Sequence, residues 1–368
     1  MNQMRYWLGF NRVPRIGPVR LRNLLNYFGD IETAWHADRA QLRAAQLSAD
    51  AIEKLVAVRA EIDLDAQMER VERAGIHLVC WDSPDYPELL KHSDQPPPLL
   101  YVRGSLEIAD ELAVAIVGTR TPTSYGKDVT RKLTYELARN QVTIVSGLAL
   151  GIDGVAHETA LEAGGRTLAV LGCGLDYIYP ASHRALAERI TSQGALISDY
   201  PLGTKPEANN FPPRNRIISG LALGTVVTEA GLGSGALITL KYANEQGRDL
   251  FAVPGSIFNR ASAGANQAIA NGEAKMVCSI EDILGDLNLN MVMQQEAARE
   301  VIPDTPTERL IANALGPEPL HIDDIVRETR LPTAEVVSTL VVMELKGSVR
   351  RADNARYVIG STLHQGAL

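Results

Sequence analysis

The sequence has little cysteine, no long apolar run and no excess of positive charge. Its 368 residues contain three cysteines. Cys80, Cys173 and Cys278 are far apart and odd in number, which suggests neither a disulfide framework nor a zinc cluster and fits a reducing cytoplasm. No stretch approaches the roughly 18 apolar residues that span a membrane, and the first residues lack the apolar run of a signal peptide. We therefore expect a cytoplasmic protein with no membrane partner.

The distribution of charge along the chain indicates where an anionic partner could bind. The formal net charge is -8, which argues against proteins that bind duplex DNA through a broad basic field. A local site for an anion is still compatible with it. Acidic residues outnumber basic ones in residues 1–112 and 284–368, whereas residues 113–283 carry equal numbers. An anionic partner should therefore bind the middle of the chain.

The chain is too long for one hydrophobic core, which usually stops growing at about 250 to 300 residues. The N-terminal block contains a Gly-Pro turn and then a helix with apolar residues at helical spacing, Leu21, Leu24, Leu25 and Phe28. The C-terminal block predicts three helices and a short hairpin, the order of a winged helix. The predicted organisation is a helical domain (1–75), an α/β domain (76–286), a polar linker (287–304) and a winged-helix domain (305–368).

The middle block alternates short β-branched runs with helical stretches, which is typical of a parallel sheet covered by helices. A strand, "IHLVCW", and a Pro-rich connector, "SDQPPPLLYVRG", lead into it. Ligands of such sheets bind at the carboxyl ends of the strands, beside helix N-termini. The expected strands are 113–117, 142–146, 167–171, 195–198, 224–228, 250–253 and 275–277.

The first candidate anion site follows the strand expected at 113–117. Gly118, Thr119 and Arg120 form a turn, and a helix is expected to begin near Ser124. Backbone N–H groups at a helix start, a hydroxyl cap and a guanidinium suit an anion. The glycine spacing does not fit a dinucleotide fingerprint, and Asp128 replaces the hydroxyl residue of a phosphate-binding P-loop. The alternative is a turn capped for stability, with Arg120 on the surface.

Two further loops end in glycine-rich turns. In "SGLALGID", Ser146 and Gly147 precede a helix expected near Asp153, and His157 lies one turn later. An acid/base or metal role is conceivable for Asp153 and His157, but a capping Asp followed by a His is commonplace, and we favour that interpretation. In "LGCGLDYIYP", the glycines permit close backbone approach, and Cys173 is interpreted as a structural thiol.

The stretch "NNFPPRNRIISGL" places two guanidinium groups beside an aromatic ring. Arginine binds phosphate oxygens bidentately, and an aromatic such as Phe211 can stack a base. Alternatively, Arg214 or Arg216 pairs with Glu229 or Asp199 inside the protein, which we expect for one of the two. Downstream, "GLGSGALITLK" begins a helix with Ser234 and Gly235, and Lys241 lies about two turns along it.

Taken together, these segments resemble the DNA-processing protein A family, also called DprA or Smf. The resemblance spans the whole chain. It rests on seven segments in the family's order: "IVGTRTPTSYG", "SGLALGID", "LGCGLDYIYP", "NNFPPRNRIISGL", "EAGLGSGALIT", "GRDLFAVPGS" and "GANQAIANGEA".

The resemblance implies an α/β fold, an extended Rossmann-like doubly wound sheet. The flanking domains would be an N-terminal helical domain, similar to a sterile-alpha-motif or helix-hairpin-helix module, and a C-terminal winged helix. It also implies a homodimer, formed through the Rossmann-like domain, that binds single-stranded DNA, protects incoming DNA and loads RecA during natural transformation.

The predicted site is non-catalytic and needs no metal or cofactor. Arg120, Arg214 and Arg216 would hold phosphates, and Phe211 would stack a base. Family members usually carry Arg where this chain has Leu150, and often a basic residue where it has Gly233, so affinity for DNA is expected to be below the family norm. The predicted DNA-binding residues are Gly118, Thr119, Arg120, Ser124, Ser146, Gly147, Phe211, Arg214, Asn215, Arg216, Ser234, Gly235 and Lys241.

Three alternatives remain at this point. The middle block is distantly similar to phosphoribohydrolases that act on nucleoside monophosphates, but nothing acidic stands near Ile238, where their catalytic Glu would fall. The winged helix could be the DNA reader, although its expected recognition helix has Glu335 and Glu344 and only Lys346 as a cation. The single hairpin around "RIGPVRLRNLLNYFG" could also contact DNA backbone.

Overall fold

The computed structural model describes residues 3–289, 305–315, 319–345, 349–352 and 355–359. These residues form two compact units, divided after Ile283. Most of the predicted linker lies outside the described residues, and the predicted domain boundary near residue 75 stays a prediction. No helix among the described residues has the length and apolar character needed to cross a membrane.

The first unit begins with a cluster of short helices, as predicted. The apolar spacing seen in the sequence buries Leu21 and Leu24, and Asp30, Asp38, Ser48 and Asp63 cap the four later helices through their side chains. The cluster shares one apolar core with the adjoining edge of the sheet. The helices are α1 (Met4–Asn11), α2 (Pro18–Phe28), α3 (Ile31–His36), α4 (Arg39–Ala44), α5 (Ala49–Glu61) and α6 (Leu64–Arg73).

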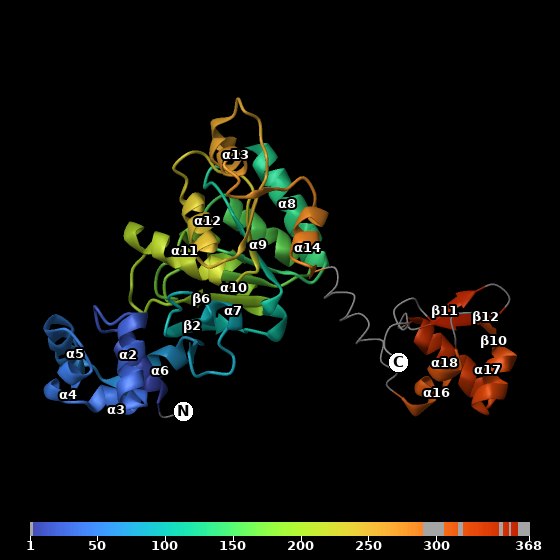
Figure 1. Cartoon of the computed structure of the whole chain (residues 1–368), viewed down its shortest axis with the longest axis horizontal. Helices are drawn as coiled ribbons and strands as arrows, with labels where there is room; N and C mark the ends of the chain where they lie inside the picture. Colours follow the sequence, from blue (N-terminus) through green and yellow to red (C-terminus); the bar gives the residue numbers. More distant parts are fainter. Residues whose placement is uncertain (1–2, 290–304, 316–318, 346–348, 353–354, 360–368) are drawn as a thin grey trace. The chain divides into compact units, whose positions relative to one another are not determined.

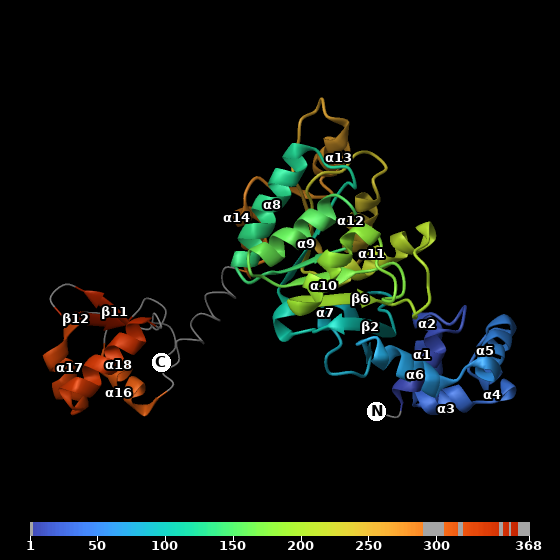
Figure 2. The same cartoon turned by 180° about the vertical axis from the view of Figure 1, so that it is seen from behind.

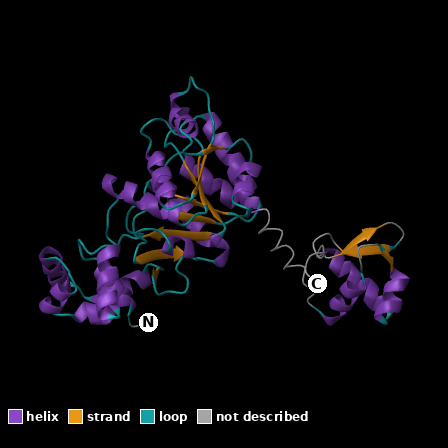
Figure 3. Ribbon diagram, in the orientation of Figure 1, coloured by secondary structure: helices purple, strands orange, loops and turns teal. Residues whose placement is uncertain are grey.

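A nine-stranded sheet forms the centre of the first unit (Figure 3). Its order is β1-β2-β6-β5-β4-β3-β7-β8-β9, and from β6 to β9 every pairing is parallel. The strands are β1 (His77–Cys80), β2 (Leu99–Gly104), β3 (Ala113–Val117), β4 (Thr143–Ser146), β5 (Thr167–Val170), β6 (Gly194–Ser198), β7 (Gly224–Val227), β8 (Asp249–Ala252) and β9 (Lys275–Met276).

All seven parallel strands lie within a residue or so of the predicted positions. The strand β2 is a correction, because the sequence interpretation treated its residues as part of a connector. It pairs with β6 in the antiparallel direction, with Tyr101 opposite Ser198. The prolines that suggested a connector, Pro96 to Pro98, end just before the strand begins.

Helices cover both faces of the sheet, so the fold is doubly wound as expected. On one face α8 packs against α9 and α9 against α10, and on the other α11 packs against α12 and α7 (Figures 1 and 2). The helices are α7 (Glu88–Lys91), α8 (Ser124–Arg139), α9 (Ile152–Glu162), α10 (Arg184–Ser192), α11 (Phe211–Gly220), α12 (Gly235–Glu245), α13 (Ala263–Ala270) and α14 (Ile280–Asp286).

The strand order reverses between β3 and β7. From β3 the chain moves to β4 on one side, and from β7 it moves to β8 on the other. At such a reversal the loops leaving the two strands diverge, so a crevice opens at their carboxyl ends. This places the loop after Val117 and the loop after Val227 at the same crevice.

The second unit has the predicted winged-helix pattern around its own apolar core. Its short third strand, β10, pairs with the hairpin and was not anticipated. The elements are α16 (Pro306–Ala314), β10 (Leu320–His321), α17 (Ile322–Thr329), α18 (Thr333–Leu345), β11 (Val349–Ala352) and β12 (Arg356–Ile359).

The helical cluster is tied to the sheet by a buried polar contact. The Tyr101 hydroxyl in β2 donates to Asn11 Oδ1 over 3.1 Å. Asn11 Nδ2 donates in turn to the Asp199 carbonyl over 3.1 Å, just after β6. One amide side chain at the end of α1 therefore satisfies a polar group on β2 and another just after β6.

Asn11→Ala is expected to lower the free energy of unfolding by about 1–3 kcal/mol, because it leaves the buried Tyr101 hydroxyl without its acceptor. Urea denaturation measures the change. Asn23→Ala, at an exposed position of α2, is the matched control and should stay within roughly 0.5 kcal/mol of the parent. Equal effects of the two substitutions would show that the contact contributes nothing.

Candidate functional site

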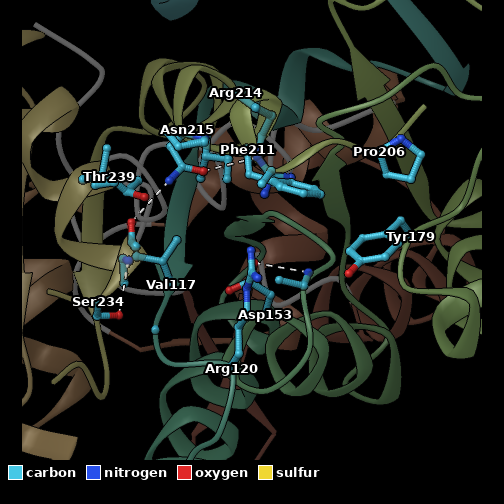
Figure 4. Close-up of a pocket in the computed structure, with 18 residues that line it drawn as sticks. Val117, Arg120, Asp153, Tyr179, Pro206, Phe211, Arg214, Asn215, Ser234 and Thr239 are labelled. Atoms are coloured by element: carbon cyan, nitrogen blue, oxygen red, sulfur yellow. Dashed lines mark hydrogen bonds between the residues drawn. The ribbon is translucent and has the colours of Figure 1, made fainter. Parts of the chain in front are cut away.

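A cavity of about 560 Å³ occupies the crevice at the carboxyl ends of the strands. In Figure 4, the Arg120 and Phe211 side chains approach each other from opposite walls, with Tyr179 and Pro206 to one side and Ser234 and Thr239 to the other. Its walls come from the loop after β3, the start of α9, α11 and the start of α12. The lining residues are Val117, Gly118, Arg120, Ala149, Asp153, Tyr179, Pro206, Ala208, Phe211, Pro212, Arg214, Asn215, Ile218, Ser234, Gly235, Ala236, Ile238 and Thr239.

Arg214 forms the inner wall of the cavity. Its side chain leaves α11 and reaches the carboxyl ends of β4 and β5, where Nη1 donates to the Gly147 carbonyl over 2.7 Å and also to the Val170 carbonyl. Only 4% of Arg214 is exposed. Burial lowers the pKa of its guanidinium, and the nearby Asp153 carboxylate opposes that shift.

Asp153 supplies the counter-charge for this buried cation. It lies in the first turn of α9, and its Oδ2 accepts hydrogen bonds from the N–H groups of Gly147 (3.1 Å) and Ala149 (3.4 Å). Burial raises the pKa of the Asp153 carboxyl, and Arg214 together with the backbone donors counteracts the rise. The two charged groups and the loop after β4 therefore stabilise one another.

An aromatic surface lies over the Arg214 side chain. The Phe211 ring centroid is 5.6 Å from that of Tyr179, with the two planes tilted by 34°. The Phe211 ring also packs directly against Gly172, which is possible because glycine has no side chain. A Cβ at this position would lie 2.9 Å from the ring. Tyr179 is 48% exposed, so the pair presents aromatic surface to the solvent in the cavity.

Arg120 is the exposed cation of the cavity. Its guanidinium carbon lies 5.5 Å from the Phe211 ring centroid, within the range of a cation–π contact. Within the described part of the chain, no carboxylate forms an ion pair with it. Unlike Arg214, it is free to exchange water for an anionic ligand.

The start of α12 adds backbone donors to the same cavity. Ser234 caps the helix by accepting a hydrogen bond from the Ala236 N–H, and a Cβ added at Gly235 would have open space around it. Asn215 of α11 reaches the Gly235 carbonyl over 3.4 Å. A helix N-terminus facing a cavity carries partial positive charge and suits an anion.

The structure brings about half of the predicted site residues together at the cavity. Those that line it are Gly118, Arg120, Phe211, Arg214, Asn215, Ser234 and Gly235. Those that do not are Thr119, Ser124, Ser146, Gly147, Arg216 and Lys241.

The residues outside the cavity have other structural partners. Ser146 is buried and donates to the Ile116 carbonyl over 2.6 Å, while Gly147 contributes its carbonyl to Arg214. The Thr119 N–H donates to the Glu229 carbonyl over 2.7 Å. Lys241 is exposed and lies 3.8 Å from Glu245.

Ser124 is exposed at the start of α8, but the helix cap is its neighbour Thr123. The Thr123 hydroxyl and N–H both donate to the carboxylate of Glu229. Glu229 is thereby used inside the protein to fix the loop after β3.

Arg216 forms an ion pair with Asp199 inside the protein. The sequence analysis expected such a pair for one of the two arginines, Arg214 or Arg216. Arg216 Nη2 lies 2.6 Å from Asp199 Oδ2, and Nη1 donates to the Gln95 carbonyl. It lines a separate cavity of about 150 Å³ beside α1 and α2. Arg214 and Arg216 therefore point to different sides of α11.

Several lining residues were missed or given another role. Asp153 was interpreted as a helix cap, and Ile238 was considered only as the position of a missing catalytic Glu. Tyr179, Pro206 and Thr239 were not singled out as site residues. Asp153 stood next to a recognised glycine turn, which was a usable signal. The other positions carry no chemistry in the sequence that separates them from ordinary loop or helix residues.

The interpretations of Cys173 and His157 agree with their surroundings. Burial raises the pKa of the Cys173 thiol to about 11, so it stays protonated at neutral pH. His157 is fully buried, and burial lowers its pKa to about 3. Its Nε2 accepts from the Leu148 N–H (3.3 Å) and its Nδ1 lies 2.7 Å from Thr167 Oγ1. His157 is thus a neutral support for the loop after β4.

The two departures from the expected family pattern lie on exposed loops. Leu150 is 48% exposed, next to Ala149 of the cavity wall. Gly233 has a φ of 74°, a conformation that a side chain rarely adopts. Any residue other than glycine would be strained there, whereas position 150 imposes no such limit.

Comparison with known proteins identifies the family. Residues 77–288 match the family model described as DNA recombination-mediator protein A. That match covers more than half of the chain and includes every wall of the cavity. The chain belongs to this family. Residues 295–354 also match the DprA winged-helix domain.

Individual members of the DprA/Smf family are similar over much of their length. The protein Smf of Synechocystis is 36% identical over 393 residues, which cover 97% of this chain and 98% of that protein. The DNA processing protein DprA of Bacillus subtilis is 44% identical over 214 residues, 58% of this chain and 72% of that one.

Two solved DprA structures are also similar. DprA from Streptococcus pneumoniae has a TM-score of 0.68 at 33% identity and covers 77% of this chain and 97% of its own. DprA from Helicobacter pylori, described for its unique mode of binding single-stranded DNA, has a TM-score of 0.53 at 31% identity over 58% of this chain and 96% of its own.

The depressed pKa of His157 predicts loss of stability in mild acid. His157 is neutral in the folded protein, whereas in the unfolded chain its pKa is near 6.5. Its contribution to the free energy of unfolding is therefore complete only above about pH 6.5. As pH falls from about 6.5 toward 3, each unit should cost about 1.4 kcal/mol of unfolding free energy.

Urea unfolding at pH 7.5 and 5.5 tests this effect. The parent should lose more stability over this interval than His157→Gln, whose side chain does not titrate, even if the variant is less stable throughout. An equal loss in both proteins would contradict a neutral, buried His157.

Proposed function

We propose that this protein binds single-stranded DNA as a non-enzymatic recombination mediator in the cytoplasm, protecting incoming DNA and loading RecA during natural transformation. The observation that carries the binding function is the exposed Arg120 guanidinium beside the Phe211 ring at a cavity bounded by the start of α12. Family membership supports the mediator role and a homodimer formed through the Rossmann-like domain. The similarity to Helicobacter pylori DprA, which binds single-stranded DNA, supports single strands as the form of DNA bound.

The cavity offers separate contacts for phosphate and base. Arg120 and the N–H groups at the start of α12 provide positive charge for a phosphate. Phe211 and Tyr179 provide aromatic surface on which an unpaired base can stack, which contributes about 1–3 kcal/mol per base. A base in a duplex is already stacked and paired, so this surface favours single strands.

Little sequence preference should follow from this arrangement. Phosphate contacts and stacking do not read the hydrogen-bonding edges of bases. Among the lining side chains, the Asn215 amide could contact a base edge, and it is already hydrogen-bonded to the Gly235 carbonyl, whereas Thr239 is buried.

The phosphoribohydrolase alternative lacks a suitably placed carboxylate. Glu229, the acid nearest the glycine loop, is held by Thr123. Asp153 does line the cavity, but its Oδ2 is occupied by two backbone donors and its charge is balanced by Arg214. Release of free base from a nucleoside monophosphate by the purified protein would overturn the proposal.

The winged helix is not proposed as the main DNA reader. On α18, the expected recognition helix, the exposed apolar residues are Val337, Val341 and Val342, and its described part contains no Lys or Arg. A helix that reads the major groove needs cationic or amide side chains near its start. Lys346 lies outside the described residues. Arg351 and Arg356 of the hairpin leave an accessory contact open.

Arg120→Ala should weaken binding of a single-stranded oligonucleotide and reduce the slope of log K against log salt by about 0.7, the loss of one phosphate contact. Mobility shifts across a salt series, with single-stranded and duplex oligonucleotides, measure both quantities. Arg139→Ala removes the same charge from an exposed position of α8 and should leave the slope unchanged. Tighter binding of duplex than of single strands would contradict the proposal.

Leu150→Arg should strengthen binding by adding a cation beside the cavity, raising the same slope by about 0.7. Leu150→Gln controls for the loss of an exposed apolar side chain without adding charge, and should not change the slope. An equal slope for the Arg and Gln variants would mean that DNA does not pass this loop.

A further inference from the structure

A second groove lies at the amino ends of the central strands, whereas the candidate site lies at their carboxyl ends. It has a volume of about 300 Å³ and two walls, the segment from Pro84 to Leu89 and the segment from Leu106 to Glu111. The second wall directly precedes β3, whereas the candidate site follows β3. The groove is lined by Pro84, Asp85, Tyr86, Pro87, Glu88, Leu89, Leu106, Glu107, Ile108, Asp110, Glu111, Leu168 and Leu221.

The groove is apolar inside. Leu168 and Leu221 are buried and contribute to its lining, together with the prolines and leucines of its walls. Ile108 stands on the short 3-10 helix of the second wall and is 87% exposed. When another molecule covers such an exposed isoleucine, its burial contributes about 1.5–3 kcal/mol to the free energy of binding.

The rim of the groove is acidic. All the charged residues that line it are carboxylates. Glu107 and Asp110 are paired with Arg166, and Glu88 lies 3.5 Å from His92 Nδ1. Asp85 and Glu111 form no ion pair within the described part of the chain. Asp85 and Glu111 therefore line the groove without a cationic partner among the described residues, one on each wall.

We propose that this groove docks a segment of a partner protein that carries a large apolar side chain flanked by Lys or Arg. The apolar interior favours the side chain, and the two unpaired carboxylates, Asp85 and Glu111, favour the flanking cations. The same carboxylates repel nucleic acid and anionic lipid. A volume of about 300 Å³ is at the lower end for ligand pockets, which suits one or two side chains rather than a folded domain.

The position of the groove allows both sites to be occupied together. β3 separates them, and five residues at about 3.3 Å each place the two ends of the strand more than 10 Å apart. A partner docked here would leave Arg120 and Phe211 accessible. This inference does not rest on the proposed DNA-binding function, because it uses none of the cavity residues.

A random-peptide library displayed on phage, selected against the full-length protein, provides the probe. The expected result is enrichment of peptides in which an aliphatic or aromatic residue stands beside Lys or Arg. A fluorescein-labelled synthetic copy of an enriched peptide is then titrated by fluorescence anisotropy. Its affinity should fall as salt rises, because the contacts with the rim are electrostatic.

Three variants are compared with the parent protein, using the same peptide. Asp85→Lys/Glu111→Lys reverses both unpaired rim charges and should weaken binding roughly fivefold or more, as should Ile108→Ser. Glu72→Lys/Glu158→Lys makes the same change in net charge at exposed positions that do not line the groove and should have no effect. All changes are at exposed positions, so folding is expected to be preserved, and circular dichroism checks it.

Four outcomes would overturn the proposal, and three of them concern the peptides. These are no enriched peptide, an enriched peptide whose binding the groove substitutions leave unchanged, or enriched peptides that are acidic. A second copy of this chain as the occupant would also overturn it. That case would be seen as a concentration-dependent dimer in sedimentation that Ile108→Ser abolishes.

Discussion

The candidate site depends on one buried cation, Arg214. Its guanidinium joins the carboxyl ends of β4 and β5 by donating to two carbonyls, and Asp153 balances its charge. Removing either partner of a buried charge pair leaves the other uncompensated, which is strongly destabilising. Because Arg214 lies one turn after Phe211 on α11, the contact that fixes the arginine also fixes the ring.

This arrangement divides two roles between chemically identical side chains. Arg214 is committed to the protein and shapes the cavity, whereas Arg120 is exposed and has no acidic partner within the described residues. A ligand that meets Arg120 displaces only water, while one that recruited Arg214 would have to break its contacts with Gly147 and Val170. Arg214 therefore holds the cavity rigid, and Arg120 remains available for a ligand. Because the cavity is already ordered, the entropic cost of binding is low.

Much of the fold could be predicted from the sequence, because β-branched runs and glycine turns alternate regularly. The strand β2 could not, since the adjacent prolines mask it and its pairing with β6 is non-local. In the site, Arg120 and Phe211 were predicted from local chemistry. Residues two apart point about 200° away from each other on a helix, which agrees with the expected split between Arg214 and Arg216, but this spacing does not show which of the two faces the cavity. Asp153 had a usable signal in the glycine turn beside it, whereas Tyr179 needed the three-dimensional structure, since its loop meets the others only after folding.

The two ends of β3 differ in electrical character. Arg120 and the positive end of α12 stand beyond the carboxyl end of the strand, and the carboxylates Asp85 and Glu111 line the groove at its amino end. Such a separation gives this region a dipole moment along the strands. At low ionic strength a long polyanion would exert a torque on it before any contact forms, and the protein would tend to arrive with its cavity foremost.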